Sequence, residues 1–369
     1  MERRLTGDFQ SLRSGEAITA LAARICEEAG PSLRIMEVCG GHTHVIMHYG
    51  LHQLLPDGIS FLHGPGCPVC IMPKGRIDHA IALARQEGVI LVTLGDMMRV
   101  PGSESSLILE RAGGRDVRTV YSPLEVLKIA GANPEKRIVY FAIGFETTAP
   151  LTAALVDRVL KEERENIFFH VNHVLISPAL HAIMADDHVK VQAFIAPGHV
   201  SVITGAGIYR SIAAQYEVPI VVSGFEPVDL LESVLMIVRQ AAEGRREVEI
   251  QYDRAVDFEG NPKAQELMER YFVPRKSFSW RGIGSIPESG LRLKEEYARF
   301  DAEIVYEDVL PVGEPCEHPA CLCGEVLRGK AEPLHCTLFG KGCTPDHPAG
   351  ACMVSSEGAC NAYYRFRQV

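Results

Sequence analysis

The chain has 369 residues, of which 47% are hydrophobic and 23% charged, and its formal net charge is −10. This length and apolar content allow a large core that divides into two or three domains, and the acidic balance argues against a nucleic-acid-binding surface. No apolar run approaches a membrane span, and the first residues lack the apolar stretch of a secretion signal. We therefore expect a soluble, cytoplasmic protein whose eleven cysteines indicate metal or thiol chemistry rather than disulfide bridges.

The first motif is CGGHTH at residues 39–44, which follows an apolar run at 33–38 that predicts a buried strand. A strand, two glycines and then a helical pattern would place Cys39 near a helix N-terminus, where backbone N–H groups lower the pKa of a thiol. His42 and His44 could ligate a metal or carry protons. The structural alternative is a buried cysteine in a tight turn with surface histidines. The glycines and histidines packed beside Cys39 favour a functional role.

The second motif is GPGCPVC at residues 64–70, after a predicted strand at 59–63. Cys67 and Cys70 form the only C-x2-C of the chain, which is the spacing of dithiol redox motifs and of half a zinc site. We expect both thiols to be exposed beside the glycines, so two inert core cysteines are the weaker interpretation. A thioredoxin fold is disfavoured because the motif lies inside a longer series of strands and helices.

The first two thirds of the chain alternate between strand and helix. Continuous apolar strands separated by helices predict parallel sheets that are covered on both faces. We therefore expect an α/β fold with two Rossmann-like domains. Helices are predicted at 16–29, 74–86 and 151–163, and further strands at 89–94, 137–143, 167–171, 192–196 and 218–222.

An internal repeat supports the expectation of two related domains. Residues 64–82 read GPGCPVCIMPKGRIDHAIA and residues 196–214 read APGHVSVITGAGIYRSIAA, and the strands that follow, VILVTLGD and VPIVVSGF, are also similar. We infer two α/β domains that face each other. His199 and Val202 replace the two cysteines in the second copy, so only the first copy keeps the thiols.

Ligands of open α/β sheets bind beyond the carboxyl ends of the strands. In GFETTAP at residues 144–150, Glu146 is expected to belong to such a site, whereas Thr147 and Thr148 fit a helix cap equally well. Four histidines are expected to be structural, hydrogen-bonded residues: His170, His173, His181 and His188. The residues expected to converge on one cleft are Cys39, Cys67, Cys70, Asp96, residues 144–148, and Gly198 with His199.

The tail at residues 316–360 holds seven of the eleven cysteines. A disulfide framework is typical of small secreted domains, and a structural zinc site usually shows two close pairs, but the tail has no C-x2-C. Thiolates from separate loops suit a [4Fe–4S] cluster, which we favour. Setting Cys316 aside, the preferred division places Cys321, Cys336, Cys343 and Cys360 on iron and leaves Cys323 and Cys352 as a redox pair, although the spacing alone leaves this division open.

The composition becomes polar from about residue 243, which indicates a domain boundary. We therefore expect three domains, at residues 1–125, 126–245 and 246–369. The segment GEVLRGK at 324–330 fits the first positions of a phosphate-binding loop, but Ala331 stands where Ser or Thr should hold magnesium, so we reject that interpretation.

Four motifs together resemble the HypD family of [NiFe]-hydrogenase maturation factors over essentially the whole chain: CGGHTH, GPGCPVC, GFETTAP and the tail pattern CGEVLRG…C…LFGKGCTP…P.G.CMVSSEGAC. The resemblance implies two Rossmann-like domains and a C-terminal iron–sulfur domain whose cluster and nearby disulfide look like those of ferredoxin:thioredoxin reductase, which supports the ligand division above. It also implies a scaffold that assembles the Fe(CN)2CO unit of the hydrogenase active site. The implied partners are a small chaperone, HypC, and the cyanide donor HypE, which is supplied by HypF.

On this resemblance, Cys39 is expected to bind the iron of the Fe(CN)2CO unit, with His42 or His44 nearby. Cys67 and Cys70 would supply electrons or thiol exchange when a thiocyanate gives up cyanide, and the tail cluster would feed them through its redox pair. The alternative is a cluster-dependent thiol–disulfide oxidoreductase of the ferredoxin:thioredoxin reductase type, which leaves CGGHTH without a role. A structural metal-binding adaptor is a third interpretation.

Overall fold

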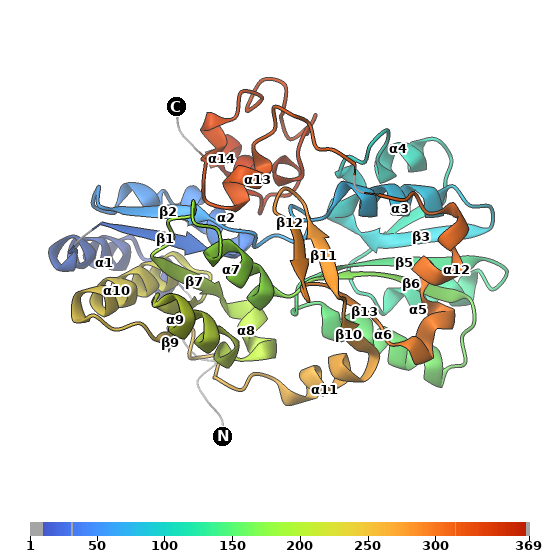
Figure 1. The fold of residues 1–369 in the computed structure, drawn as a ribbon, viewed down its shortest axis with the longest axis horizontal. Coiled ribbons are helices and arrows are strands. Elements are labelled where there is room, and N and C mark those ends of the chain that lie inside the picture. The colour runs from blue at the N-terminus through green and yellow to red at the C-terminus, as the bar shows by residue number, and fades with distance from the viewer. Residues whose placement is uncertain (1–9, 31, 314, 367–369) are drawn as a thin grey trace.

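The structure is a computed structural model that describes residues 10–30, 32–313 and 315–366. The first nine residues, which carry most of the segment that we examined for a secretion signal, lie outside this range. No helix in the described part of the chain is long and apolar enough to cross a membrane. Two α/β lobes lie side by side, and the cysteine-rich tail lies at the top of the view, above α2 and the region where the lobes meet (Figure 1).

The first sheet has five parallel strands in the order β2-β1-β7-β8-β9. Its apolar strands are buried, as the continuous apolar runs predict. Helices α1 (Gly15–Glu28), α2 (Gly40–His48) and α10 (Pro227–Glu243) pack with this sheet around one aliphatic core. The strands are β1 (Leu33–Glu37), β2 (Ile59–His63), β7 (Ala193–Pro197), β8 (Ile220–Ser223) and β9 (Val248–Ile250).

The second sheet has four parallel strands in the order β4-β3-β5-β6. Both sheets are Rossmann-like, which confirms the predicted fold class. The strands are β3 (Val89–Leu94), β4 (Val117–Val120), β5 (Arg137–Gly144) and β6 (Ile167–His173). The helices from the end of β2 to the end of β6 are α3 (Lys74–Ala84), α4 (Leu107–Ala112), α5 (Glu125–Ala132) and α6 (Ala149–Lys161). Helix α7 (Ile176–Met184) leads back to the first sheet, where α8 (Gly198–Thr204) and α9 (Arg210–Tyr216) lie between β7 and β8 in the chain.

The two sheets do not follow the boundaries predicted at residues 125 and 245. The chain leaves the first sheet after β2, builds the whole second sheet, and returns with β7, which pairs with β1. The boundary at 125 therefore falls inside the second sheet, and β9 of the first sheet lies beyond 245. A composition profile follows chain order, whereas strand pairing is decided by which edges meet in space.

The internal repeat also has a different meaning from the one we inferred. Its two copies follow β2 and β7, which flank β1 in the same sheet. The strand after the first copy, β3, enters the second sheet, whereas the strand after the second copy, β8, stays in the first. Both copies therefore begin at the carboxyl ends of strands of the first sheet, but the helix of the first copy, α3, packs with β3 of the second sheet, whereas α8 of the second copy packs with β7 and β8 of the first.

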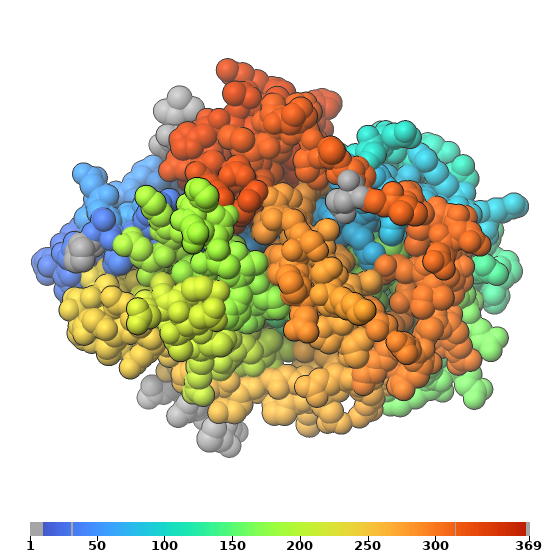
Figure 2. Space-filling model, in the orientation of Figure 1, coloured from blue at the N-terminus to red at the C-terminus, as the bar shows by residue number. Residues whose placement is uncertain are grey.

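The last third of the chain contains two small hairpin-like pairs and then the tail. The antiparallel pairs, β10 with β13 and β11 with β12, lie between the two large sheets (Figure 1). The tail forms a cap in the space-filling view (Figure 2), and its helices contact α2 and β2 of the first sheet. The elements are α11 (Pro262–Tyr271), β10 (Phe272–Pro274), β11 (Ser277–Trp280), β12 (Gly284–Pro287), β13 (Leu291–Leu293), α12 (Ala302–Val305), α13 (Cys323–Leu327) and α14 (Ala359–Phe366).

Candidate functional site

Cys39 lies at the carboxyl end of β1, as the N-cap residue of α2, and a buried carboxylate holds it there. Glu37 accepts a hydrogen bond from the Cys39 backbone N–H, at 3.0 Å, and another from the hydroxyl of Thr43. His63, the last residue of β2, lies 2.7 Å from Glu37 through Nδ1 and 3.2 Å from the hydroxyl of Tyr363 through Nε2. Glu37 and His63 were not among the predicted site residues. Their signal is that each is a polar residue at the end of an apolar strand.

The thiol of Cys39 is buried, and its Sγ lies 3.6 Å from Nδ1 of His199. Burial raises the pKa of Cys39 more than the N–H groups at the start of α2 lower it. The lowered pKa predicted from the helix N-terminus is therefore wrong, because desolvation outweighs the local dipole. Burial also lowers the pKa of His199 to about 4, so its imidazole is neutral near pH 7.

The two histidines of CGGHTH separate in the structure. His42 is buried, its ring nitrogens make no hydrogen bond to any described residue, and burial lowers its pKa. The ring of Phe225 lies between His42 and His199, with centroid distances of 5.2 Å to each. His44 instead faces the tail: its Nδ1 lies 3.3 Å from the carbonyl oxygen of Ser356. His42 thus belongs to the buried group around Cys39, whereas His44 belongs to the contact with the cap.

Cys67 and Cys70 are buried, so the predicted exposure is wrong. The reason is long-range packing. The backbone N–H of Arg281 donates to the carbonyl of Ile71 at 2.8 Å, which holds the β11–β12 turn over this segment. Gly66 brings the same segment against the Cys39 backbone, since a Cβ on Gly66 would lie 2.2 Å from the Cys39 nitrogen. A hydrogen bond with Cys67 and burial together raise the pKa of Cys70.

Six thiols gather within the tail. Cys352 lies in the middle of one group, with its Sγ 3.0 Å from that of Cys360. Its hydrogen bond to Cys323 is the largest cause of the raised pKa of Cys323. Burial and neighbouring thiols raise the pKa of Cys321 to about 12. The neighbours of Cys321 are Cys323, Cys336 and Cys343. The structure therefore brings the predicted ligands and the predicted redox pair into one group.

The backbone approaches the tail thiols closely. In the described part of the chain, no three His, Cys, Asp or Glu side chains are placed to hold one metal ion. The backbone N–H of Ala349 donates to the sulfur of Cys343 at 3.3 Å, the kind of contact that tunes cluster sulfurs. A Cβ on Gly350 would lie 2.7 Å from the sulfur of Cys321, so the backbone passes close to the thiols. Cys26 and Cys316 are exposed.

The two thiol groups of the chain are adjacent. The thiols of Cys352 and Cys323 act electrostatically on Cys70, which places the C-x2-C segment next to the tail pair. The cap is fastened at the same place, because Ser355 donates to Asp96 at 3.1 Å and Arg99 donates to the carbonyl of Val354 at 3.0 Å. The carboxyl ends of β1, β2 and β3 thus meet the tail at one junction.

Glu146 is buried just beyond the carboxyl end of β5. Its Oε1 accepts from the backbone N–H of Ile176 at 2.9 Å, Oε2 has no partner among the described residues, and burial raises its pKa to about 7. Both Glu146 and Cys39 act electrostatically on the buried Tyr209, which links Glu146 to the thiol site. Thr148 is the N-cap residue of α6, but its hydroxyl donates to the carbonyl of Ile143 and does not cap the helix.

The capping interpretation of GFETTAP is therefore wrong for Thr148, and the hydroxyl of Thr147 has no described partner. The histidines expected to be structural are hydrogen-bonded: His170 to His79, His173 to Thr152, His181 to Ser211 and His188 to Asp186.

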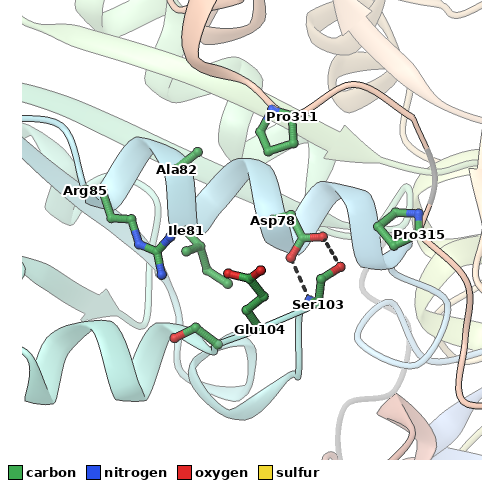
Figure 3. Close-up of a pocket in the computed structure, with 9 residues that line it drawn as sticks. Asp78, Ile81, Ala82, Arg85, Ser103, Glu104, Pro311 and Pro315 are labelled. Carbon is green, nitrogen blue, oxygen red and sulfur yellow. Dashed lines mark hydrogen bonds between the residues drawn. The ribbon is translucent and has the colours of Figure 1, made fainter.

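One cavity of the molecule lies away from the thiols, and another is lined by two of them. A cavity of about 330 Å³ lies between α3, residues 103–105, Pro311 and Pro315, and Asp78 accepts hydrogen bonds from Ser103 beside it (Figure 3). Its lining includes no cysteine or histidine, so it is not part of the candidate site. A cavity of about 180 Å³ is lined by Cys321, Cys323 and Arg281 together with neighbouring residues of the tail.

Comparisons with known proteins agree with these motifs. The HypD family model, described as "Hydrogenase formation hypA family", matches residues 16–367. The chain is 50% identical over 362 residues to hydrogenase maturation factor HypD of Azotobacter vinelandii, which covers 96% of this chain and 95% of the relative. It is 45% identical over 353 residues to hydrogenase maturation factor HypD of Escherichia coli K12, and this match covers 96% of this chain and 94% of that relative. The chain therefore belongs to the HypD family of hydrogenase maturation factors.

Proposed function

We propose that this protein is the scaffold on which the Fe(CN)2CO unit of the [NiFe]-hydrogenase active site is assembled, and that Cys39 binds the iron. The observation that carries the proposal is the buried Cys39 thiol, 3.6 Å from His199, with the unpartnered ring of His42 in the same group. A soft thiolate suits low-spin iron with strong-field ligands. The neutral ring of His199 can share a hydrogen bond with the Cys39 thiol and hold the sulfur in place.

Cys321, Cys336, Cys343 and Cys360 would hold a [4Fe–4S] cluster, which supplies single electrons when it is bound. The thiols of Cys336, Cys343 and Cys360 each interact electrostatically with Cys321, and this proximity supports the assignment. In this proposal Cys323 and Cys352 remain free to alternate between dithiol and disulfide.

The adjacency of the two thiol groups gives the C-x2-C segment its role. A Cys323–Cys352 dithiol would reduce a Cys67–Cys70 disulfide: one S–S bond forms at the tail, one breaks at the motif, and two electrons and two protons pass between them. The electrostatic contact of Cys70 with both tail thiols supports exchange between the two pairs. The resulting dithiol would then serve the step in which a thiocyanate group gives up cyanide.

The proposed partners are a HypC-type small chaperone, which would share the iron, and HypE, the cyanide donor, itself supplied by HypF. The maturation-factor relatives support work with other maturation proteins. All eleven cysteines are unpaired in the structure, which suits a reducing compartment such as the cytoplasm.

Infrared spectroscopy of the anaerobically purified protein, alone and with its small chaperone partner, tests the scaffold. We expect bands of iron-bound CN and CO that vanish in Cys39→Ala while the brown cluster colour survives, and that persist in the control Cys26→Ala, which changes an exposed cysteine outside the motifs. Absence of the bands with an intact cluster and bound partner contradicts the proposal. Disulfide reductase activity without that iron would instead support the oxidoreductase alternative, which the adjacency of the two thiol groups also fits.

A further inference from the structure

Arg281, in the turn between β11 and β12, is buried with two unpaired donors. Only 3% of the residue is exposed, and its Nη2 donates to Glu317 at 2.8 Å. Nε and Nη1 make no hydrogen bond to any residue in the described ranges. Buried polar groups nearly always have partners, and an unpaired charged donor is costly to bury. These two nitrogens therefore indicate an acceptor that the protein chain does not itself provide.

The charge of Arg281 is also incompletely balanced. Its one carboxylate partner, Glu317, also faces the ammonium group of Lys74 at 3.9 Å. The neighbouring pair of Arg328 and Glu325 is neutral as a unit, with a separation of 2.9 Å. One positive charge is therefore in excess at this place. A buried cation needs a negative partner, so the missing acceptor is expected to be anionic.

The position of the turn identifies that acceptor. Arg281 lines the 180 Å³ cavity together with Cys321 and Cys323, and its charge acts on the thiol of Cys323. The turn cannot move far from these thiols, because a Cβ on Gly282 would lie 2.4 Å from the Cα of Gly324. The backbone of Arg281 also holds the C-x2-C segment through the carbonyl of Ile71. Besides the carboxylates of Glu317 and Glu325, which already have cationic partners, the cavity is lined by the thiols of Cys321 and Cys323, and a thiol becomes anionic when it binds a metal cluster.

We propose that Arg281 is a redox-tuning residue, whose guanidinium donates N–H groups to the sulfur atoms of the tail cluster and its thiolates and offsets their negative charge. The inference rests on the proposed function, since it requires a cluster in the tail. A cluster held by four thiolates is anionic, and its reduction potential depends on net charge and on hydrogen bonds to the sulfurs. A nearby cation stabilises the more negative, reduced form, so Arg281 raises the potential.

The test is a potentiometric titration of the cluster, followed by electron paramagnetic resonance, in the anaerobically purified full-length protein. Arg281→Met, which removes the charge, should shift the potential to more negative values, and Arg281→Lys, which keeps the charge but not the planar fork, should lie between this variant and wild type. Glu317→Gln removes the neutralising carboxylate and should shift the potential in the opposite direction. Arg292→Met removes the same charge from an exposed pair with Glu295 and should leave the potential unchanged.

The opposite signs exclude a purely structural effect, because a loosened tail would not move the potential in two directions. An unchanged potential in Arg281→Met with an intact cluster overturns the inference and leaves the scaffold proposal standing. If Arg281→Met cannot retain the cluster, the reduction potential is measured in Arg281→Lys and Glu317→Gln instead. The inference then fails unless the potential of Glu317→Gln is more positive than that of wild type. A wild-type protein without any cluster overturns both the inference and the cluster assignment in the proposed function.

Discussion

Replacement of Gly66 by alanine tests whether the two thiol motifs must touch. A Cβ at this position would lie 2.2 Å from the nitrogen and 2.3 Å from the Cα of Cys39, whereas ordinary contacts begin at 3.4 Å. The two backbones would therefore have to separate by 3.4 minus 2.2, or about 1.2 Å. The atoms in the way are backbone atoms, so no side-chain rotation can relieve the contact. Overpacking of this kind costs about 1–3 kcal/mol of stability.

The functional effect of Gly66→Ala should exceed the loss of stability. The same separation weakens the hydrogen bond from the Gly40 N–H to the Gly66 carbonyl, 3.3 Å long, and displaces Cys39 from His199. A misplacement of roughly 1 Å at a reactive group can reduce a rate by about 100-fold, so we expect the infrared bands of iron-bound CN and CO to be nearly lost while the cluster colour remains.

The assay pairs those infrared bands with the midpoint of thermal unfolding. Gly15→Ala is the matched control, because a Cβ there meets no atom within 4 Å. It should leave both the bands and the midpoint close to those of wild type. A Gly66→Ala protein with wild-type bands and an unchanged midpoint would refute the reasoning, since it would show that the motifs need not approach so closely.

Three further predictions concern buried groups. Burial raises the pKa of Glu146 from its usual 4.5 to about 7, so this carboxyl contributes stability below pH 4.5 that is lost as the pH rises through 7. Glu146→Gln should therefore gain up to about 3 kcal/mol relative to wild type between pH 4.5 and 7 in urea unfolding, and a pH-independent difference would contradict this. His63→Ala removes a hydrogen-bond partner of the buried Glu37 and should lower the free energy of unfolding by about 1–3 kcal/mol, which an unchanged urea midpoint would exclude. Cys343→Ala should lose the brown absorbance and the iron of the cluster, whereas Cys352→Ala should keep both, and the reverse result would reassign the ligands.

The sequence alone determined the elements and the chemistry of the molecule. The apolar run at 33–38 is β1, the helical pattern at 16–29 is α1, and the alternation of strand and helix is a pair of parallel sheets. These features depend on neighbouring residues, because the spacing of apolar side chains decides which local conformation can bury them. The cysteine-rich motifs are equally local, and they identified the family before any contact was known.

Only the tertiary structure decided which strands share a sheet and what surrounds each thiol. The strand β1 pairs with β7, far along the chain, and Glu37 meets His63 and, through it, Tyr363 near the C-terminus. Cys67 and Cys70 are buried because a distant turn covers them. The raised pKa of Cys39 follows from its own burial beside His199 and Gly66 rather than from its helix. Desolvation depends on every segment that packs around a group, and most of those segments are remote in sequence. No local sequence pattern can therefore predict it.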